Sequence, residues 1–344
     1  MLAAQLIAPH VFRLEAQDLP APGPGEVQVR VDAVGICGSD LHAYSEGAVG
    51  DTPCQYPMVL GHEPAGTVVA VGAGVTGWTP GDRAALEPAL YCYHCEYCRA
   101  GRYNICANLR FLSNPGDPGF FRERVNLPAA NLLALPPTVS LETGSLVEPL
   151  AVALHSIRLA GMKAGETVAI WGAGPIGLLT IACLKIAGAG CIWVFEPLPH
   201  RRELAAGVGA DNALDPKDAE TVIAEDTNKR GVDCAIDCAA RGETTNQAIR
   251  AARHGGRVVL TGIHSHPVVP FETSPMRRKE LVFYNVRRSN EEPADALRLL
   301  TEHAARFAPL ITHTRRLEQI AEAFLIAETY SDGAGKVIVG RNPG

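Results

Sequence analysis

The chain has 344 residues, of which 47% are hydrophobic and 20% charged, a composition typical of soluble globular proteins. Its 31 Lys and Arg against 37 Asp and Glu give a formal charge of -6, so it has no basic excess for binding nucleic acid or a membrane surface. The first nine residues lack the basic region and the long apolar run of a secretory signal. We therefore expect a cytoplasmic protein with neither nucleic-acid nor membrane partners.

The first 146 residues alternate short β-rich runs, such as Val27–Val34 and Thr67–Val71, with clusters of Gly and Pro. This pattern predicts a mainly β domain. Residues 147–285 instead alternate apolar strands with helical stretches rich in Ala and Leu, which predicts a parallel sheet. The expected strands of this sheet are Thr167–Trp171, Cys191–Glu196, Cys234–Asp237 and Arg257–Leu260.

In residues 286–344 the pattern changes again. We expect helices at Pro293–Arg306 and Leu317–Glu328 and a final strand at Lys336–Val339. The sequence contains no internal repeat and no low-complexity linker. We therefore predict an α/β protein in which the parallel-sheet domain is inserted within the first domain, with the C-terminal segment returning to that first domain.

The segment 167–184 runs 18 residues without a charge, the length at which a membrane-spanning helix becomes possible. Glycines at Gly172, Gly174 and Gly177 disrupt such a helix and predict a strand, a tight turn and then a helix. A Gly-x-Gly-x-x-Gly pattern in this context is typical of dinucleotide binding, because the backbone can approach the pyrophosphate and the helix N-terminus faces the anion. An ordinary glycine turn is the alternative.

Glu196 stands nineteen residues after Gly177, at the end of the next expected strand. A carboxylate there can accept hydrogen bonds from the adenosine ribose hydroxyls, which favours NAD over NADP. Arg201 and Arg202 follow closely, and a guanidinium can instead bind a 2′-phosphate, so NADP remains an alternative.

Four of the ten cysteines follow the pattern Cys92-x2-Cys95-x2-Cys98-x7-Cys106. Four thiolates in one short loop can wrap a tetrahedral zinc ion and leave no position open for substrate, so we predict a structural zinc site. An iron–sulfur cluster and unligated thiols are the alternatives. We expect His94, inside the loop, to point away from the metal.

A second group combines the thiol of Cys37 with the imidazole and carboxylate of His62 and Glu63. Three protein ligands with an open fourth position are the arrangement of a catalytic zinc site. An ion held there acts as a Lewis acid and lowers the pKa of a bound alcohol. Taken alone, a buried His62 would more often be a core histidine, but its combination with a nucleotide site favours the zinc prediction.

These residues resemble the zinc-dependent medium-chain dehydrogenases, and the resemblance extends from the first strand to Lys336. Three stretches are most similar to the polyol branch, which includes sorbitol, idonate and butanediol dehydrogenases: Gly35–His42, Pro57–Glu63 and Val147–His155. The resemblance implies a GroES-like catalytic domain with an inserted Rossmann domain, two zinc ions per chain and NAD. It also implies a homotetramer or homodimer that pairs through an edge strand near Val282–Val286.

The resemblance also implies roles for individual residues. Cys37 and His62 should hold the catalytic zinc, with Glu63 or Glu148 as the third ligand. Ser39 resembles the hydroxyl that receives the substrate proton, and His42 can pass this proton towards solvent, while Asp40 orients a zinc ligand. The remaining cofactor-binding residues that it implies are Ile176, Glu196, Arg201, Thr261, Gly262, Ile263, Val286 and Arg287.

Two departures from the sorbitol enzymes concern the substrate. Those enzymes have Tyr directly after the His that matches His42, whereas this chain has Ala43 and then Tyr44. They have Phe-Arg-Tyr where this chain has Val286-Arg287-Arg288, and a second guanidinium suits an acidic substrate. Besides Ser39 and Glu148, we therefore expect Tyr44, Arg287 and Arg288 to contact substrate; a solvated surface arginine is the alternative for Arg288.

The combined pattern predicts an enzyme that transfers hydride from a secondary hydroxyl of a polyol or a sugar acid to NAD. A simple alcohol, a vicinal diol or threonine is the alternative substrate on the same fold. A non-catalytic nucleotide-binding sensor is disfavoured, because such a protein would have no use for an open metal site.

Overall fold

The computed structural model describes residues 1–341, and the chain forms two compact units. One unit consists of Met1–Glu148 and Asn290–Gly344, and we call it the catalytic unit; the other, Pro149–Ser289, is the nucleotide unit. The second is inserted into the sequence of the first, which confirms the predicted α/β fold class with an inserted parallel-sheet domain. Residues 342–344 of the expected C-terminal segment lie outside the described residues.

The catalytic unit is built on a seven-stranded sheet. Its strands in chain order are β3 (Glu26–Gly35), β7 (Glu63–Val71), β8 (Arg83–Leu86), β11 (Arg124–Pro128), β12 (Leu132–Ala134), β19 (Ile311–Arg315) and β20 (Lys336–Gly340). The strand order is β12-β8-β7-β3-β20-β19, and β11 also pairs with β3. The C-terminal strands therefore pair directly with the N-terminal ones.

Shorter elements complete this unit. The strands β1 (Leu2–Ala8), β2 (Val11–Ala16) and β6 (Met58–Val59) form a three-stranded sheet, and β4 (Ala48–Val49), β5 (Thr52–Pro53), β9 (Ala89–Leu90) and β10 (Arg110–Phe111) form two-stranded ones. The α-helices are α1 (Gly38–Glu46), α2 (Glu96–Arg99), α3 (Leu141–Gly144), α10 (Pro293–Glu302), α11 (Ala304–Phe307) and α12 (Ile320–Thr329). The single helix predicted over 293–306 is divided at His303, whose φ of -127° leaves the helical region.

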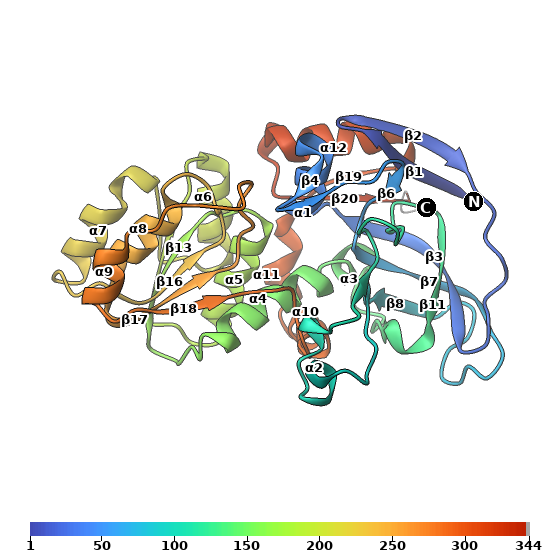
Figure 1. Ribbon diagram of the computed structural model, residues 1–344, viewed down its shortest axis with the longest axis horizontal. Coiled ribbons are helices and arrows are strands. Elements are labelled where there is room, and N and C mark those ends of the chain that lie inside the picture. The colour runs from blue at the N-terminus through green and yellow to red at the C-terminus, as the bar shows by residue number, and fades with distance from the viewer. Residues whose placement is uncertain (342–344) are drawn as a thin grey trace. The chain divides into compact units, whose positions relative to one another are not determined.

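The nucleotide unit is a six-stranded parallel sheet with the order β15-β14-β13-β16-β17-β18. This order is that of a doubly wound dinucleotide-binding fold. In Figure 1, α5 and α8 lie on opposite sides of the sheet. The elements are α4 (Val147–Leu159), β13 (Thr167–Trp171), α5 (Pro175–Ile186), β14 (Cys191–Phe195), α6 (Pro199–Val208), β15 (Asn212–Leu214), α7 (Ala219–Asp226), β16 (Val232–Asp237), α8 (Thr244–Ala251), β17 (Ala252–Leu260), α9 (Thr273–Arg278) and β18 (Val282–Asn285).

The uncharged segment 167–184 folds as predicted, with β13 followed by the glycine turn and the start of α5. Its central strand is completely buried from Val168 to Trp171, because helices cover both faces of a parallel sheet. None of the helices within residues 1–341 has the combined length and apolarity that crossing a bilayer requires.

Candidate metal centres and nucleotide site

Cys37 is the N-cap residue of α1, and Asp40 in the first turn fixes its backbone. One Asp40 carboxylate oxygen accepts a hydrogen bond from the Cys37 N–H (3.1 Å), and the other accepts one from the Gly61 N–H (3.2 Å) and lies 3.4 Å from His62 Nδ1. Burial would raise the pKa of Asp40, but attraction to His62 and these hydrogen bonds outweigh burial and lower it. Asp40 thereby joins the two loops that carry the predicted zinc ligands.

The pairing of β3 with β7 brings these loops together, because Gly35 at the end of β3 lies opposite Glu63 at the start of β7. The ligand atoms of Cys37, His62 and Glu63 all lie within 4.8 Å of one another. Side chains at Gly35 would overlap the Glu63 carboxylate, so this close approach requires glycine. One thiolate, one imidazole and one carboxylate fit a catalytic zinc ion with an open fourth position.

His62 is buried, with 7% of its surface exposed. Burial would lower its pKa, but the charge of Asp40 and side-chain hydrogen bonds to Asp40 and Cys37 outweigh this effect and raise the pKa well above its usual value. Zinc binds neutral imidazole, so metal binding at this site must release the His62 proton.

Lys336, the first residue of β20, is a neighbour of this group that the sequence did not single out. Its ammonium group forms an ion pair with Glu63, and it donates a hydrogen bond to the Ile36 carbonyl (2.9 Å). Both side chains of the ion pair are only 1% exposed. Lys336 therefore balances the Glu63 charge, and a lysine beginning an otherwise apolar final strand is the only sequence signal that points to it.

Glu148 lies outside the group whose ligand atoms are within 4.8 Å, so the geometry favours Glu63 as the third ligand. The ionised form of Glu148 nevertheless interacts electrostatically with the residues of the predicted zinc site. Burial raises the pKa of Glu148 to about 8, repulsion by Glu63 adds to this effect, and attraction to His62 and Lys336 opposes it. Without a metal ion, Glu148 is therefore largely protonated at neutral pH.

We expect Glu148→Gln to stabilise the protein at alkaline pH once the catalytic zinc has been removed. Folding raises the pKa of Glu148 from 4.5 in the unfolded chain to about 8 in the folded protein. The folded protein therefore loses stability as the pH rises between these two pKa values, because the buried carboxyl group must lose its proton. Glutamine stays neutral, so the variant should gain about 2–4 kcal/mol in free energy of unfolding between about pH 5 and about pH 9. Urea unfolding of both metal-stripped proteins at the two pH values measures this gain; an unchanged difference would contradict it.

Ser39 and His42 both lie on α1, three residues apart and hence on one face of the helix. The Ser39 hydroxyl lies 3.5 Å from His62 Nε2. His42 Nδ1 lies 2.9 Å from a carboxylate oxygen of Glu46, which is 41% exposed. This arrangement is compatible with proton transfer from the zinc ligands towards solvent.

Tyr44 is a correction to the expected substrate contacts. Its side chain is 4% exposed and belongs to the hydrophobic core of the catalytic unit. Its ring stacks on Phe12 (centroids 5.6 Å apart) and contacts Phe324 (5.0 Å). Moving the aromatic residue one place along α1 turns it by about 100°, here into the core instead of towards a substrate.

The four cysteines of the loop at residues 92–106 converge as predicted. All four Sγ atoms lie within 4.8 Å of one another. The Sγ atoms of Cys92 and Cys106 are 3.4 Å apart, and the Cys92–Cys98 and Cys95–Cys106 separations are both 3.9 Å. A tetrahedral zinc ion with Zn–S bonds of about 2.3 Å requires separations of about 3.8 Å. His94 is not part of the cluster, since its Nδ1 lies 2.7 Å from the Cys92 carbonyl. The cluster fits a structural zinc ion.

The glycine turn of the nucleotide unit has the geometry that its pattern predicts. Gly172 has a φ of 93°, which favours glycine, and a side chain on Gly177 would overlap the Gly172 carbonyl. α5 then begins with Pro175 in its first turn, so its free N–H groups face the turn. A helix N-terminus of this kind fits the pyrophosphate of a dinucleotide.

Glu196 follows β14 and is 3% exposed. One carboxylate oxygen accepts a hydrogen bond from the Ala173 N–H of the glycine turn (2.7 Å), and the other accepts one from the Leu198 N–H (3.0 Å). Arg201 is buried, and its Nη1 lies 3.8 Å from the position of a side chain on Gly174. Arg202 donates from Nη1 to the carbonyls of Glu196 (2.7 Å) and Pro197 (2.9 Å).

The other expected cofactor contacts lie after the ends of β17 and β18. The N–H groups of Thr261 and Gly262 both donate to the Asp237 carbonyl (2.9 Å each), and Ile263 is 48% exposed. The remaining predicted residues are Ile176 in the first turn of α5, and Val286, Arg287 and Arg288 after β18. Arg287 is exposed, whereas Arg288 is partly buried. Their contacts with cofactor or substrate stay a prediction.

Comparisons with known proteins identify the family of this chain. A family model for the alcohol dehydrogenase GroES-like domain matches residues 23–137, and one for zinc-binding dehydrogenases matches 175–302. Sorbitol dehydrogenase of Gallus gallus is 37% identical, covering 95% of this chain and 92% of that protein; L-idonate 5-dehydrogenase of Vitis vinifera is 35% identical, covering 98% and 93%. A solved zinc-binding dehydrogenase of Sinorhizobium meliloti 1021, bound to NADP, has a TM-score of 0.89 and 32% identity, covering 99% of both chains.

Proposed function

Since this chain belongs to the zinc-binding medium-chain dehydrogenases, on the polyol branch of that family, we propose that it oxidises a secondary hydroxyl of a polyol or a sugar acid with NAD. The observation that carries this proposal is the convergence of Cys37, His62 and Glu63 in a chain that also has the dinucleotide-binding turn. The sorbitol and L-idonate dehydrogenases among its relatives support the substrate class.

Cys37, His62 and Glu63 would hold the catalytic zinc, which would supply Lewis-acid activation of the alcohol, and the glycine turn would hold the nicotinamide cofactor, which would supply the hydride acceptor. In this proposal Ser39 accepts the substrate proton, and His42, with Glu46 beside it, passes the proton to solvent. Asp40 orients His62 and holds the Cys37 backbone. Glu148, whose carboxyl group interacts electrostatically with His62 and Glu63, would be the alternative third residue to hold the zinc.

We propose NAD as the preferred cofactor. The Glu196 carboxylate lies against the glycine turn, where its charge would repel a 2′-phosphate, and Arg202 donates to two backbone carbonyls near by. Arg201 remains near the turn as a partner for the adenosine half.

A substrate panel tests the proposed function. We expect nicotinamide reduction by the zinc-loaded protein with polyols or aldonates, and a higher kcat/KM with NAD than with NADP.

We propose that Arg288 contacts an acidic substrate. Arg288→Ala should then raise KM for aldonates about tenfold or more and leave KM for neutral polyols unchanged. Arg278→Ala, an exposed arginine on α9, is the matched control. Activity confined to simple alcohols or threonine would contradict the polyol proposal, and an equal effect on both substrate classes would exclude the role of Arg288.

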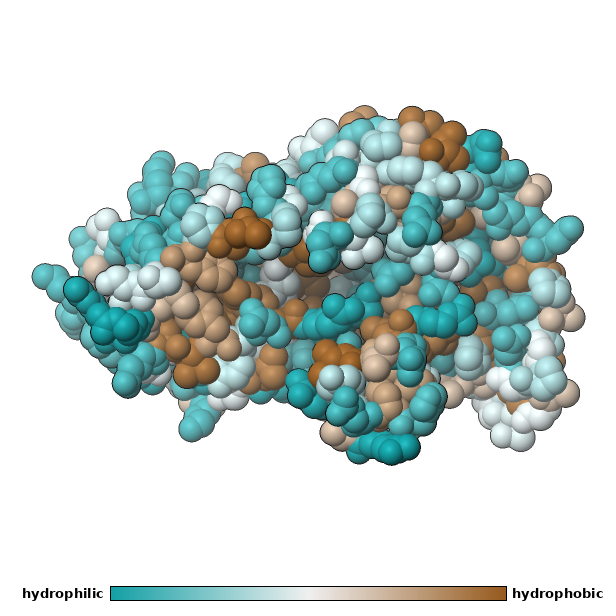
Figure 2. All heavy atoms as spheres, viewed as in Figure 1, coloured by the Kyte–Doolittle hydropathy of each residue, from teal (hydrophilic) through white to brown (hydrophobic). Residues whose placement is uncertain are grey.

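We further propose that two copies pair through β18, one of the two edge strands of the nucleotide sheet. Val282 on this strand is 47% exposed, and Figure 2 shows apolar residues gathered over it. Light scattering should give the mass of a dimer or a tetramer; a monomer would contradict this proposal.

We also propose a cytoplasmic location. The ten free cysteines support it, because a reducing compartment keeps thiols unpaired.

A further inference from the structure

The catalytic unit contains a pocket of about 330 Å³ that none of the predicted site residues lines. It lies where β3, β11 and the end of β20 meet the short 3₁₀ turn Leu317–Gln319. Five of its lining residues are arginines, and we call it the arginine pocket: Arg30, Arg122, Arg124, Arg316 and Arg341. Its volume lies at the lower end of the range for small-molecule sites, about 300–1,000 Å³.

The charges around the arginine pocket are not balanced. Only two acidic residues line it, and one of them, Glu123, already accepts a hydrogen bond from the Leu2 N–H (2.7 Å). Arg30 is paired with Asp32 (2.7 Å). Within residues 1–341, the other four arginines have no carboxylate within ion-pair distance. The pocket is therefore a cationic region in a chain whose formal charge is -6.

Two of the arginines are held in positions that an anion would stabilise. Arg124 lies directly opposite Arg30 in the pairing of β11 with β3, where like charges repel each other. Arg122 donates from Nη2 to the Pro118 carbonyl (3.1 Å), but its Nε is buried and has no acceptor among the described residues. Burial also lowers the pKa of Arg122 to about 10. An unpaired buried donor destabilises the folded protein, so Arg122 is held here by its surroundings and not by a charge partner of its own.

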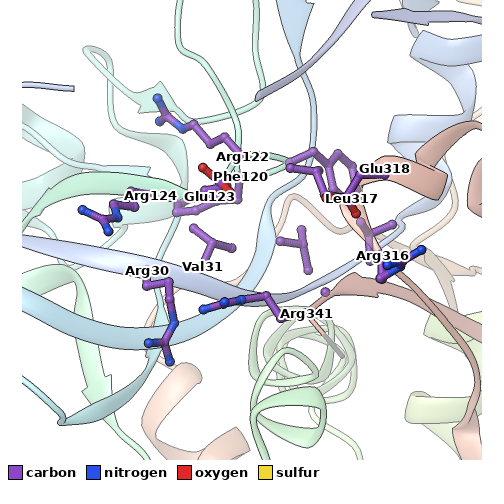
Figure 3. Close-up of a pocket in the computed structure, with 14 residues that line it drawn as sticks. Arg30, Val31, Phe120, Arg122, Glu123, Arg124, Arg316, Leu317, Glu318 and Arg341 are labelled. Carbon is purple, nitrogen blue, oxygen red and sulfur yellow. The ribbon is translucent and has the colours of Figure 1, made fainter. Parts of the chain in front are cut away.

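We propose that the arginine pocket binds a small molecule that carries a phosphate group, at a site separate from the zinc ligands. Figure 3 shows Arg122, Arg124, Arg341 and Arg30 on one side of the pocket and Arg316 on the other, with the guanidinium groups of Arg122, Arg124 and Arg30 at its outer edge. Guanidinium groups bind phosphate oxygens through pairs of hydrogen bonds, and several such forks suit a phosphate better than a single carboxylate. Val31 and Leu317 supply an apolar surface for an organic body.

The arginine pocket shares two strands with the catalytic zinc ligands. Val34 of β3 lines the pocket, and Cys37 follows the end of that strand. Gly340 of β20 also lines it, and Lys336, the ion-pair partner of Glu63, begins β20. A ligand in the pocket should therefore stabilise the strands that carry the zinc site.

Calorimetric titration of the zinc-loaded protein with inorganic pyrophosphate, in the presence of NADH and at constant ionic strength, tests this proposal. NADH occupies the glycine turn, so the titration reports on other anion sites. We expect saturable binding that the double variant Arg124→Gln, Arg341→Gln weakens about tenfold or more. Arg298→Gln is the matched control, because Arg298 is an exposed arginine of the same unit that pairs with Glu302 (2.9 Å). The affinity of Arg298→Gln for pyrophosphate should equal that of the unmodified protein.

Three results would overturn the proposal: no saturable binding at millimolar pyrophosphate, unchanged affinity in the double variant, or equal weakening in Arg298→Gln. Equal weakening in Arg298→Gln would identify general charge attraction. Unchanged affinity in the double variant would identify chelation of zinc or a different anion site. Arg124 and Arg341 are exposed and have no side-chain partner in residues 1–341, so the double variant should fold. Its melting temperature without pyrophosphate checks this, and Arg316→Gln, at the opposite side of the pocket, provides a second test.

Discussion

Replacing Cys37 with alanine should remove one of the two zinc ions per chain and lower kcat/KM for alcohol oxidation by at least about a thousandfold. The thiolate is the soft ligand of the predicted catalytic site, and its loss leaves only His62 and the Glu63 carboxylate, which Lys336 already neutralises. A Lewis acid contributes several kcal/mol to transition-state stabilisation, and each 1.36 kcal/mol corresponds to a factor of ten in rate. Zinc content by mass spectrometry and steady-state kinetics measure both effects.

Cys54→Ala provides the control for this experiment. Cys54 is a partly buried cysteine of the same unit and belongs to neither metal group, so two zinc ions and nearly full activity should remain. Circular dichroism should show an unchanged fold in both variants. If Cys37→Ala retained two zinc ions and normal turnover, Cys37 would not be a ligand of a catalytic zinc.

Replacing Cys98 with serine should produce the largest loss of local stability. Cys98 is 4% exposed, and the lobe at residues 92–106 contains only the four-residue helix α2 and one 3₁₀ turn, so little apolar surface holds it together. Zinc binding contributes about 10–16 kcal/mol in small zinc-dependent domains. The variant should lose one zinc ion, and amide hydrogens of this lobe should exchange at the rate of an unfolded segment.

Hydrogen exchange across the whole chain distinguishes a local effect from a global one. Protection in the nucleotide unit should be unchanged, because its core is separate from the lobe. Cys191→Ser, a partly buried cysteine of the nucleotide unit, is the control and should retain both zinc ions. A protected, zinc-loaded lobe in Cys98→Ser would show that the four cysteines do not form a zinc site.

Features whose determinants lie close together in the chain could be predicted from the sequence. The four cysteines are separated by two, two and seven residues, so one short loop can bring them together. The glycine pattern likewise combines a strand, a turn and a helix within about a dozen residues. Apolar periodicity was sufficient to predict the alternation of strands and helices and therefore the fold class.

Site details that depend on contacts between distant residues required the tertiary structure. The register of β3 with β7 and β20 places Glu63 beside Lys336, which is 273 residues later in the sequence numbering, and leaves Glu148 outside the compact ligand group. The rotation of α1 places the Tyr44 ring in the core, although its position near His42 in the sequence suggested a substrate contact. The arginine pocket is likewise formed by residues from 30 to 341.

The sequence by itself therefore determined the fold class, the zinc-binding loop and the dinucleotide turn, because each depends on local spacing and on the burial pattern of single elements. The tertiary structure decided which charges are paired, which carboxylate joins Cys37 and His62, and where unpaired arginines gather. The physical reason is that electrostatic interactions depend on distance and burial in three dimensions, and only strand register and helix rotation set these for residues far apart in the chain.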